Sequence, residues 1–277
     1  MSTAVSVRHG AFGRAAIYEL NKPIIPHGHR EGHLIFYLDG APAVVNVSGV
    51  DYITDRENAV AISPWEPHSF DIHSSTHEAC LCLVLYIKPI WFLESSQTAE
   101  FTLNFGRSRI RVTEQVQQWM HRLTSQLLEE ENESLFNGYL FETTAQCYQQ
   151  SWKGQLNNSI LDNLRSRFSD YRVRRSLQLM QDNFRDAFEM ESLAREVGLS
   201  RPHFFKLFKK QMGVTPNLYL NTLRSEKAIE YLMTTEKTVS DIGFDLGFSS
   251  QASFTRFFAS NVGIPPSDYR RVANIGA

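Results

Sequence analysis

The pattern of apolar and polar positions changes character twice along the chain. Up to about residue 105, short apolar or alternating segments are separated by turn residues, which is typical of β-strands. Asp39-Gly40 is a dipeptide typical of a tight hairpin turn. Several short strands at this spacing indicate a sandwich or a barrel. The predicted strands are Ala15–Leu20, Leu34–Leu38, Ala43–Val47, Ala59–Ser63, Ser69–Ile72 and Ala79–Ile87.

Between residues 110 and 150 the apolar period becomes helical. A polar break over residues 129–133 separates an amphipathic helix from a second helix at about 134–150. Such a helix pair is either a dimer surface or a strut packed on the β-sheet, and both interpretations stay open. Residues 151–168 predict a weak linker with some helix near its apolar positions, so 106–165 forms a helical dimerisation or linker region. Those apolar positions are Ile160, Leu161 and Leu164.

The last hundred residues contain the same helix–turn–helix pattern twice. The first copy runs from Leu193 through Gly198 and Ser200 to Phe208, and the second from Ile242 through Gly247 and Ser250 to Phe258. The copies align at an offset of 49 residues before the turn and 50 after it. Each copy ends in a Gly-x-x-Pro-x-x-Tyr match, completed by Tyr219 and Tyr269. A helix at 171–183 precedes the first unit, and a long helix at 216–233 links the two.

Each residue type in this repeat has a local role. Gly198 and Gly247 stand where the first helix of each unit ends, a position that needs a residue tolerant of positive φ. Ser200 and Ser250 are placed to cap the next helix. The inward face of that second helix is predicted to be aromatic in both units. It comprises Phe204, Leu207 and Phe208 in the first, and Phe254, Phe257 and Phe258 in the second.

The outward positions of the second helices have side chains that suit DNA bases and phosphates. Arg and Lys can bind guanine, Gln can pair with adenine, and apolar side chains can contact a thymine methyl group. Two such units can place two recognition helices in successive major grooves. The candidate DNA-binding residues are Arg201, Pro202, Phe205, Lys206, Lys209, Lys210, Ser250, Gln251, Ala252, Thr255 and Arg256.

Charge supports this assignment only locally. The formal net charge of the 277 residues is −2, but the stretch from Asp170 onward holds 15 basic and 12 acidic residues. The basic half is therefore the half that contains the repeat. Because this excess is small, DNA binding must depend on where the charges stand, not on an overall field.

Residues 170–271 resemble the DNA-binding domain of the AraC/XylS family. The resemblance rests on the two turns, on Leu223-Arg-Ser-Glu-Lys-Ala228 and on Ile242-Gly-Phe-Asp-Leu-Gly-Phe248. It implies a domain at 166–277 with helix–turn–helix units at about 189–211 and 238–260. It also implies a transcription regulator, usually an activator, that contacts RNA polymerase and works as a homodimer. Pro202 and Phe205 stand where the family often has polar side chains, which predicts shape and methyl contacts there.

The N-terminal half is similar to a cupin barrel, the sensor domain common in the same family. The similarity lies in His27-Gly-His29-Arg-Glu31-Gly-His33 and, further on, in Pro64-Trp-Glu-Pro-His68-Ser-Phe70. It implies an effector-binding domain at 1–105. In metal cupins such groups bind one ion, and imidazoles suit Zn, Fe, Ni, Cu or Mn. His33 stands where those proteins usually carry a carboxylate.

The histidines His27, His29, His33 and His68 are thus candidate ligands of an effector or of a divalent metal. The alternative is that they anchor strands or contact an organic ligand through hydrogen bonds. Aromatic side chains near them either line an apolar effector pocket or belong to the core. These are Tyr18, Phe36, Trp65 and Tyr86.

Together these patterns predict an α+β protein with an N-terminal cupin-like β-barrel, a helical hairpin and a C-terminal all-α DNA-binding domain. The expected function is transcription regulation controlled by a small-molecule effector. The alternatives are a metal-dependent cupin enzyme fused to a DNA-binding domain and a ligand-independent regulator. No apolar run reaches membrane-spanning length and no secretory stretch is present, so a cytoplasmic protein without a membrane partner is expected. Cys80, Cys82 and Cys147 are expected to be packed thiols.

Overall fold

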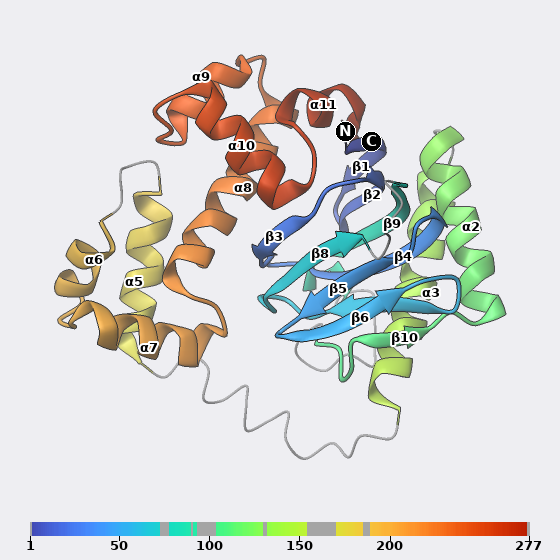
Figure 1. The fold of residues 1–277 in the computed structure, drawn as a ribbon, viewed down its shortest axis with the longest axis horizontal. Coiled ribbons are helices and arrows are strands. Elements are labelled where there is room, and N and C mark those ends of the chain that lie inside the picture. Colours follow the sequence, from blue (N-terminus) through green and yellow to red (C-terminus); the bar gives the residue numbers. More distant parts are fainter. Residues whose placement is uncertain are drawn as a thin grey trace. The chain divides into compact units, whose positions relative to one another are not determined.

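The computed structural model describes residues 2–72, 78–89, 91–92, 104–129, 132–153, 170–184 and 189–275 (Figure 1). Two compact units are present. The first comprises Met1–Lys153 together with Phe258–Ala277, and the second comprises Gly154–Phe257. This grouping differs from the predicted domain boundaries at 105 and 165, because the helical hairpin and the C-terminal segment both group with the β-domain. The helix suggested by Ile160, Leu161 and Leu164 falls outside the described residues.

Two sheets build the β-domain. A seven-stranded sheet has the order β10-β7-β4-β9-β2-β1-β11, and a four-stranded sheet has the order β3-β8-β5-β6. Every pairing is antiparallel except that of β1 with β11. The strands are β1 (Thr3–Gly10), β2 (Gly13–Leu20), β3 (Ile24–His27), β4 (Gly32–Gly40), β5 (Ala43–Val47), β6 (Val50–Thr54), β7 (Asn58–Ile62), β8 (His68–Ile72), β9 (Cys80–Ile87), β10 (Arg109–Arg111) and β11 (Ala273–Ile275).

All six predicted strands are confirmed, but the predicted hairpin turn at Asp39-Gly40 is wrong. Asp39 and Gly40 continue β4 and pair with Leu81 and Cys80 of β9. The next strand, β5, belongs to the other sheet. The tight hairpin lies instead between β5 and β6, where Ser48 and Gly49 both adopt positive φ, 53° and 92°. Two positive φ values are what a two-residue turn between twisted strands requires.

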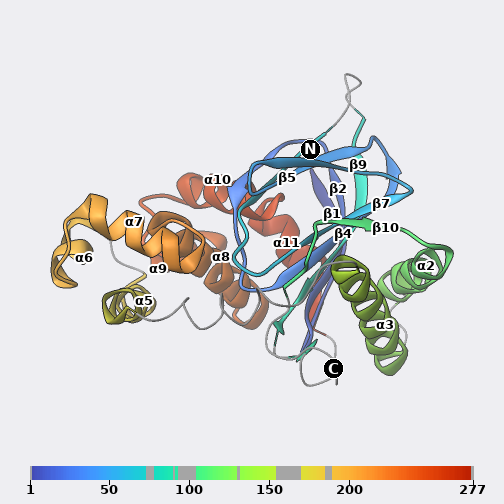
Figure 2. The same ribbon diagram turned by 90° about the horizontal axis from the view of Figure 1, so that it is seen from below.

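The helical hairpin covers the outer face of the seven-stranded sheet. Helices α2 (Glu114–Glu129) and α3 (Glu133–Trp152) lie side by side next to the β-domain (Figure 2). The apolar stripe of α2 and residues such as Phe136 and Leu140 of α3 are buried against sheet residues such as Leu34 and Leu85. This packing favours the strut interpretation for the inward face. The outward face retains exposed apolar side chains, including Leu128 and Leu135.

The helices from residue 170 onward agree with the sequence prediction. They are α5 (Tyr171–Asp182), α6 (Met190–Glu196), α7 (Arg201–Met212), α8 (Pro216–Thr234), α9 (Val239–Asp245), α10 (Gln251–Val262) and α11 (Pro266–Val272). The offset of 49 residues between α6 and α9 becomes 50 between α7 and α10, as the repeat predicts. Helix α11 and strand β11 were not predicted. The hydroxyl of Tyr269 in α11 lies 2.8 Å from Nε2 of His9 and accepts a hydrogen bond from Arg14.

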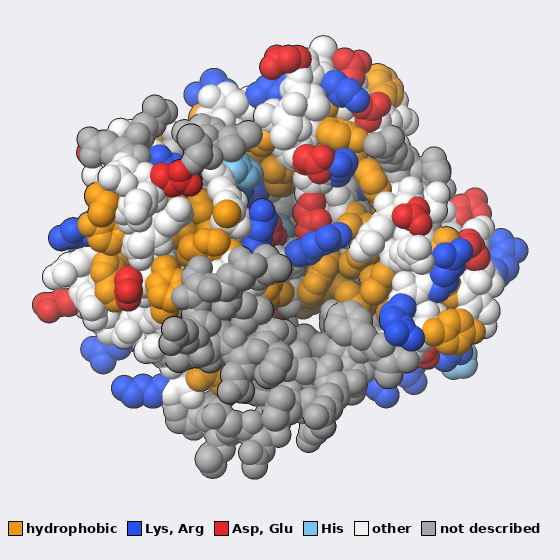
Figure 3. Space-filling view, turned by 180° about the vertical axis from the view of Figure 1, so that it is seen from behind, with side chains coloured by type: hydrophobic (Ala, Val, Ile, Leu, Met, Phe, Trp, Pro, Cys, Tyr) orange, Lys and Arg blue, Asp and Glu red, His pale blue; other side chains and the backbone are white. Residues whose placement is uncertain are grey.

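Charge is mixed over the surface. Lys and Arg side chains are interspersed with Asp and Glu on the face shown in Figure 3, in keeping with the small net charge. No helix among the described residues is long and apolar enough to cross a membrane. Cys80, Cys82 and Cys147 are buried free thiols, as expected.

Candidate metal centre and nucleic-acid interface

The first helix–turn–helix unit consists of α6 and α7. Gly198 has φ +74° at the end of α6, the left-handed conformation that its position predicts. Ser200 occupies the N-cap of α7, but its side chain makes no capping hydrogen bond. The predicted side-chain cap is therefore wrong at Ser200. Phe204 and Phe208 are fully buried, whereas Leu207 is half-buried.

The second helix–turn–helix motif consists of α9 and α10. Thr238 begins α9 with a capping box that involves Asp241, and Gly247 has φ +79°. The hydroxyl of Ser250 accepts a hydrogen bond from the backbone N–H of Ser253 at 3.2 Å, so the predicted cap is present here. The two helices approach closely at Gly243, where an added Cβ would lie 2.9 Å from Cβ of Phe254.

The predicted DNA-binding side chains lie on the faces opposite these buried phenylalanines. In α7 the exposed candidates are Arg201, Pro202, Lys206, Lys209 and Lys210, and Phe205 is half-buried with the Arg201 guanidinium 5.1 Å from its ring centre. In α10 the exposed candidates are Gln251, Ala252 and Arg256, with Ser250 and Thr255 half-buried. The first helix therefore offers four basic side chains and the second offers one. Such a division suits phosphate binding by α7 and base discrimination by both.

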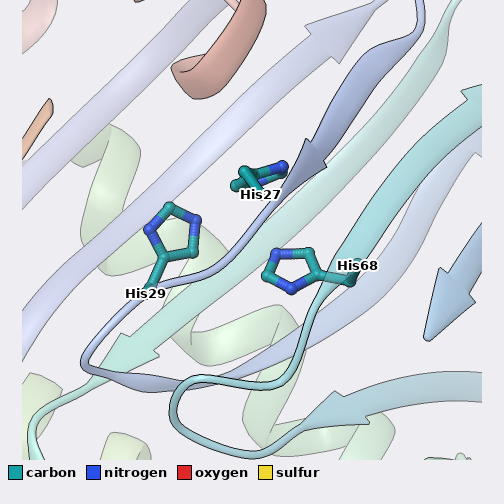
Figure 4. A group of neighbouring side chains, drawn as sticks. All are labelled: His27, His29 and His68. Carbon is teal, nitrogen blue, oxygen red and sulfur yellow. The ribbon is translucent and has the colours of Figure 1, made fainter. Parts of the chain in front are cut away.

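A second candidate site lies in the β-domain, where the imidazoles of two histidines close in sequence and of a third, about 40 residues later, converge (Figure 4). His27 ends β3, His68 begins β8, and His29 lies in the loop that leads to β4. One ligand nitrogen from each lies within 4.8 Å of the others. The ring of His33, in β4, is centred 4.4 Å from that of His68, although His33 is outside the convergent group of three. The site thus connects the two sheets of the β-domain.

Hydrogen bonds fix the orientation of two of these rings. Nδ1 of His27 lies 2.7 Å from the carbonyl oxygen of Ile25, and Nδ1 of His68 lies 2.7 Å from that of Glu66. Each Nδ1 donates its proton to the carbonyl, so each Nε2 is left as an acceptor. Nε2 of His29 and of His68 is buried without a hydrogen-bond partner among the described residues. Buried acceptors without donors are unfavourable, and a cation would satisfy them.

Burial keeps the imidazoles neutral. It lowers the pKa of His27 to about 4 and the pKa values of His29, His33 and His68 well below their usual range. The neighbouring histidines and the buried guanidinium of Arg14 lower the pKa of His29 further. Neutral imidazoles retain the lone pair that metal coordination needs, so protons do not compete for these nitrogens near pH 7.

The cavity beside these rings is small. It measures about 30 Å³, is lined by His27, His33 and His68 but not by His29, and also touches Tyr18 and Tyr86. That volume holds a water molecule or an ion. Phe36 was a candidate for the same pocket but belongs to the core beneath α2 and α3, and Trp65 does not line the cavity either. For Phe36 the core alternative is confirmed, because a strand alternates its side chains between opposite faces of the sheet. Trp65 lies in the turn between β7 and β8, with φ +64°.

Sequence reasoning missed one charged residue next to this site. Arg14 of β2 is buried, and its guanidinium lies 3.7 Å from the ring centre of Tyr86. The Tyr86 ring is in turn centred 5.2 Å from that of His33. No sequence signal distinguished Arg14, because a single arginine in a strand is ordinarily placed on the solvent side.

The buried histidines predict a loss of stability in acid. In the metal-free protein each is neutral when folded but is protonated in the unfolded chain below its usual pKa of about 6.5. Their contribution is complete above that pH and falls as the pH approaches the folded value, about 4 for His27. At pH 5.5 we expect the free energy of unfolding to be lower than at pH 7.5 by about 1.4 kcal/mol for each buried histidine. Urea unfolding at the two pH values measures this difference. His68→Gln should reduce this pH dependence relative to the wild-type protein, and an equal pH dependence in the two proteins would contradict the account.

Comparisons with known proteins agree with this architecture. Residues 193–272 match the family model described as a helix-turn-helix domain. The HTH-type transcriptional activator RhaS of Escherichia coli is 26% identical over 253 residues, covering 89% of this chain and 87% of RhaS. ToxT from Vibrio cholerae has a similar fold, with a TM-score of 0.56 at 15% identity over 98% of this chain and 97% of ToxT. A structure of ToxT with a bound unsaturated fatty acid has a TM-score of 0.55 at 13% identity, over 93% of this chain and 94% of that one.

Two helix–turn–helix units behind an N-terminal β-domain define a DNA-binding transcription regulator. Over its helix-turn-helix domain and over most of its length, the chain resembles transcription regulators of the AraC type. The relatives are transcription regulators, which are not enzymes, so the alternative of a metal-dependent enzyme is not retained.

Proposed function

We propose that this regulator responds to a divalent transition metal ion held in the β-domain by His27, His29 and His68. The observation that carries the proposal is the convergence of three neutral imidazoles, with nitrogens within 4.8 Å of one another. Nε2 of His29 and Nε2 of His68 have no hydrogen-bond partner among the described residues. The DNA-binding activity itself belongs to α7 and α10.

The residues fit such an ion in type and almost in distance. Imidazole nitrogens are preferred ligands of Zn, Cu, Ni and Fe. At a metal–nitrogen distance of about 2.1 Å in tetrahedral geometry, two ligand nitrogens on one ion are about 3.4 Å apart. The imidazole nitrogens, which lie within 4.8 Å of one another, therefore need to approach by up to about 1.4 Å to share an ion. The carbonyl groups of Ile25 and Glu66 already hold two of the rings as a metal site requires.

The size of the cavity argues against an organic effector at the same place. Sites for metabolites and lipids usually measure about 300–1,000 Å³, and the cavity lined by His27, His33 and His68 is about 30 Å³. A fatty acid such as the one bound by ToxT would need a different site or a rearranged barrel. A small organic effector that contacts the histidines directly remains the second candidate, supported by the unpartnered nitrogens alone.

The ion would act by joining parts of the two sheets. His27 and His68 lie on the four-stranded sheet, and His29 lies on the loop to β4 of the seven-stranded sheet. A metal that binds one arrangement of these strands better than another shifts the population toward that arrangement.

In keeping with RhaS, a transcriptional activator, we expect this regulator to activate transcription through RNA polymerase. We also expect a homodimer, formed through the outward face of α2 and α3, where Leu128 and Leu135 are exposed.

Elemental analysis of the full chain, purified without a chelator or a histidine tag, tests the metal site. We expect close to one transition metal ion per chain in the wild-type protein and in His121→Ala, a matched variant on exposed α2. We expect almost none in the double variant His27→Ala/His29→Ala. No metal in the wild-type protein, even after incubation with zinc or nickel salts and desalting, would leave the organic effector as the better hypothesis.

A further inference from the structure

A second recess lies outside the barrel, between the edge strand β10 and the C-terminal part of α3. We call it the β10 groove. Its volume is about 580 Å³, within the usual range for sites that bind metabolites. Its basic side chains are Arg107, Arg109, Arg111 and Lys153, and its only acidic one is Glu57. The groove shares no residue with the histidine cavity.

The walls of the groove are tied together by hydrogen bonds. The backbone N–H of Gly106 donates to the hydroxyl of Ser151 at 3.1 Å, and the indole N–H of Trp152 donates to the carbonyl of Asn104 at 2.9 Å. A guanidinium nitrogen of Arg107 donates to the carbonyl of Lys153. The segment before β10 and the end of α3 therefore form one preformed wall, which lowers the entropy lost on binding.

The strand presents backbone donors to the groove as well as side chains. The carbonyl of Ser108 accepts a hydrogen bond from the backbone N–H of Ala61 in β7, and the N–H of Val112 donates to the carbonyl of Glu57, just before β7. Because an antiparallel ladder alternates, the N–H groups of Arg109 and Arg111 face the opposite edge. β10 is the end strand of its sheet, and α3 lies against it. The same two residues thus offer N–H groups at the edge of the sheet and guanidinium groups on one of its faces.

Among the described residues that line the groove, four basic side chains face one acidic side chain. Arg109 and Arg111 are exposed, with no recorded ion pair there, and they stand two residues apart on one face of β10. Their Cα atoms are therefore only about 7 Å apart, so the two cations repel each other. The side-chain amide nitrogen of Gln150, half-buried beside them, has no acceptor among the described residues. Each of these features favours a ligand rich in anionic oxygen atoms.

We propose that the β10 groove binds a small organic dianion, a molecule that carries a phosphate ester or two carboxylates. Guanidinium groups bind such groups through paired hydrogen bonds, and Gln146 and Asn58 provide further polar contacts in the wall. An acidic peptide added to the sheet would find only the short edge of a three-residue strand. The groove is therefore a second effector site, independent of the histidine site.

Calorimetric titration of the full chain at constant ionic strength tests the proposal. The probes are 3-phosphoglycerate, succinate and inorganic phosphate, which distinguish a phosphate ester from a dicarboxylate and from phosphate alone. We expect saturable binding of one molecule per chain for at least one organic probe. Arg109→Gln/Arg111→Gln should weaken it at least tenfold, because each charge-assisted hydrogen bond contributes about that factor. Arg109→Lys/Arg111→Lys should retain part of the affinity.

The control removes two exposed charges elsewhere on the β-domain, in Lys22→Gln/Lys88→Gln, and should leave binding unchanged. His27→Ala/His29→Ala should also bind normally, which separates this site from the metal site. Circular dichroism and the unfolding temperature verify that each variant is folded. The proposal is overturned if no probe binds saturably, if both double glutamine variants respond alike, or if duplex DNA displaces the probe from the groove.

Discussion

Replacing Arg256 or Lys206 with alanine should lower the affinity for a specific DNA site about 5- to 150-fold. Each side chain is exposed two positions after a fully buried phenylalanine, Phe254 or Phe204. Two residues correspond to about 200° around a helix, so both side chains project from the face opposite the core. A base contact by such a side chain contributes about 1–3 kcal/mol of discrimination.

The measurement is a titration of a duplex selected from random sequence by the full chain, in parallel with a scrambled duplex. Arg175→Ala is the matched control, since Arg175 is exposed on α5 and pairs with Glu196 at 3.8 Å. The ratio of specific to nonspecific affinity should fall in Arg256→Ala and Lys206→Ala and persist in Arg175→Ala. An unchanged ratio in both recognition-helix variants would remove these residues from the interface.

The helices of the C-terminal half could be predicted closely because its sequence contains the same motif twice. Each copy confirms the assignment of the other, and glycines at Gly198 and Gly247 mark both turns through their positive φ. Helix α11 escaped prediction because it has only seven residues and begins within a Pro-Pro pair, with Pro265 at its N-cap and Pro266 as its first residue. Proline at the first helical position is favourable, but that signal is short and was interpreted only as part of the repeat.

The strands were harder to predict where polar residues occupy buried positions. β1 carries Arg8 and Ser6 at buried positions, so its apolar alternation is hidden. β3 contains Pro26, which ordinarily argues against a strand, and β10 has two arginines in three residues. The turn at Asp39-Gly40 was misassigned because Gly40, at φ +80°, lies within a strand where the neighbouring backbone passes very close to it. An added Cβ there would lie 2.1 Å from the carbonyl oxygen of Ala79.

The candidate metal centre was predictable in its residue types but not in its geometry. The spacing of His27 and His29 and the later His68 indicated a cluster, and the structure brings these three together. The sequence could not show that Nε2 of His68 lacks a partner or that the cavity is too small for a metabolite. Both properties arise from the pairing of β3 with β8, which is a tertiary contact. Metal binding by these residues stays a prediction.

The most direct test of the central claim compares DNA affinity with and without metal. The full chain is freed of metal with a chelator, dialysed, and titrated with its selected duplex before and after addition of one equivalent of zinc or nickel. We predict at least a fivefold change in affinity, the lower end of typical coupling between two sites, and no change in His27→Ala/His29→Ala. Equal affinities in the metal-free and metal-loaded wild-type protein, with the metal shown to be bound, would contradict a metal-responsive regulator.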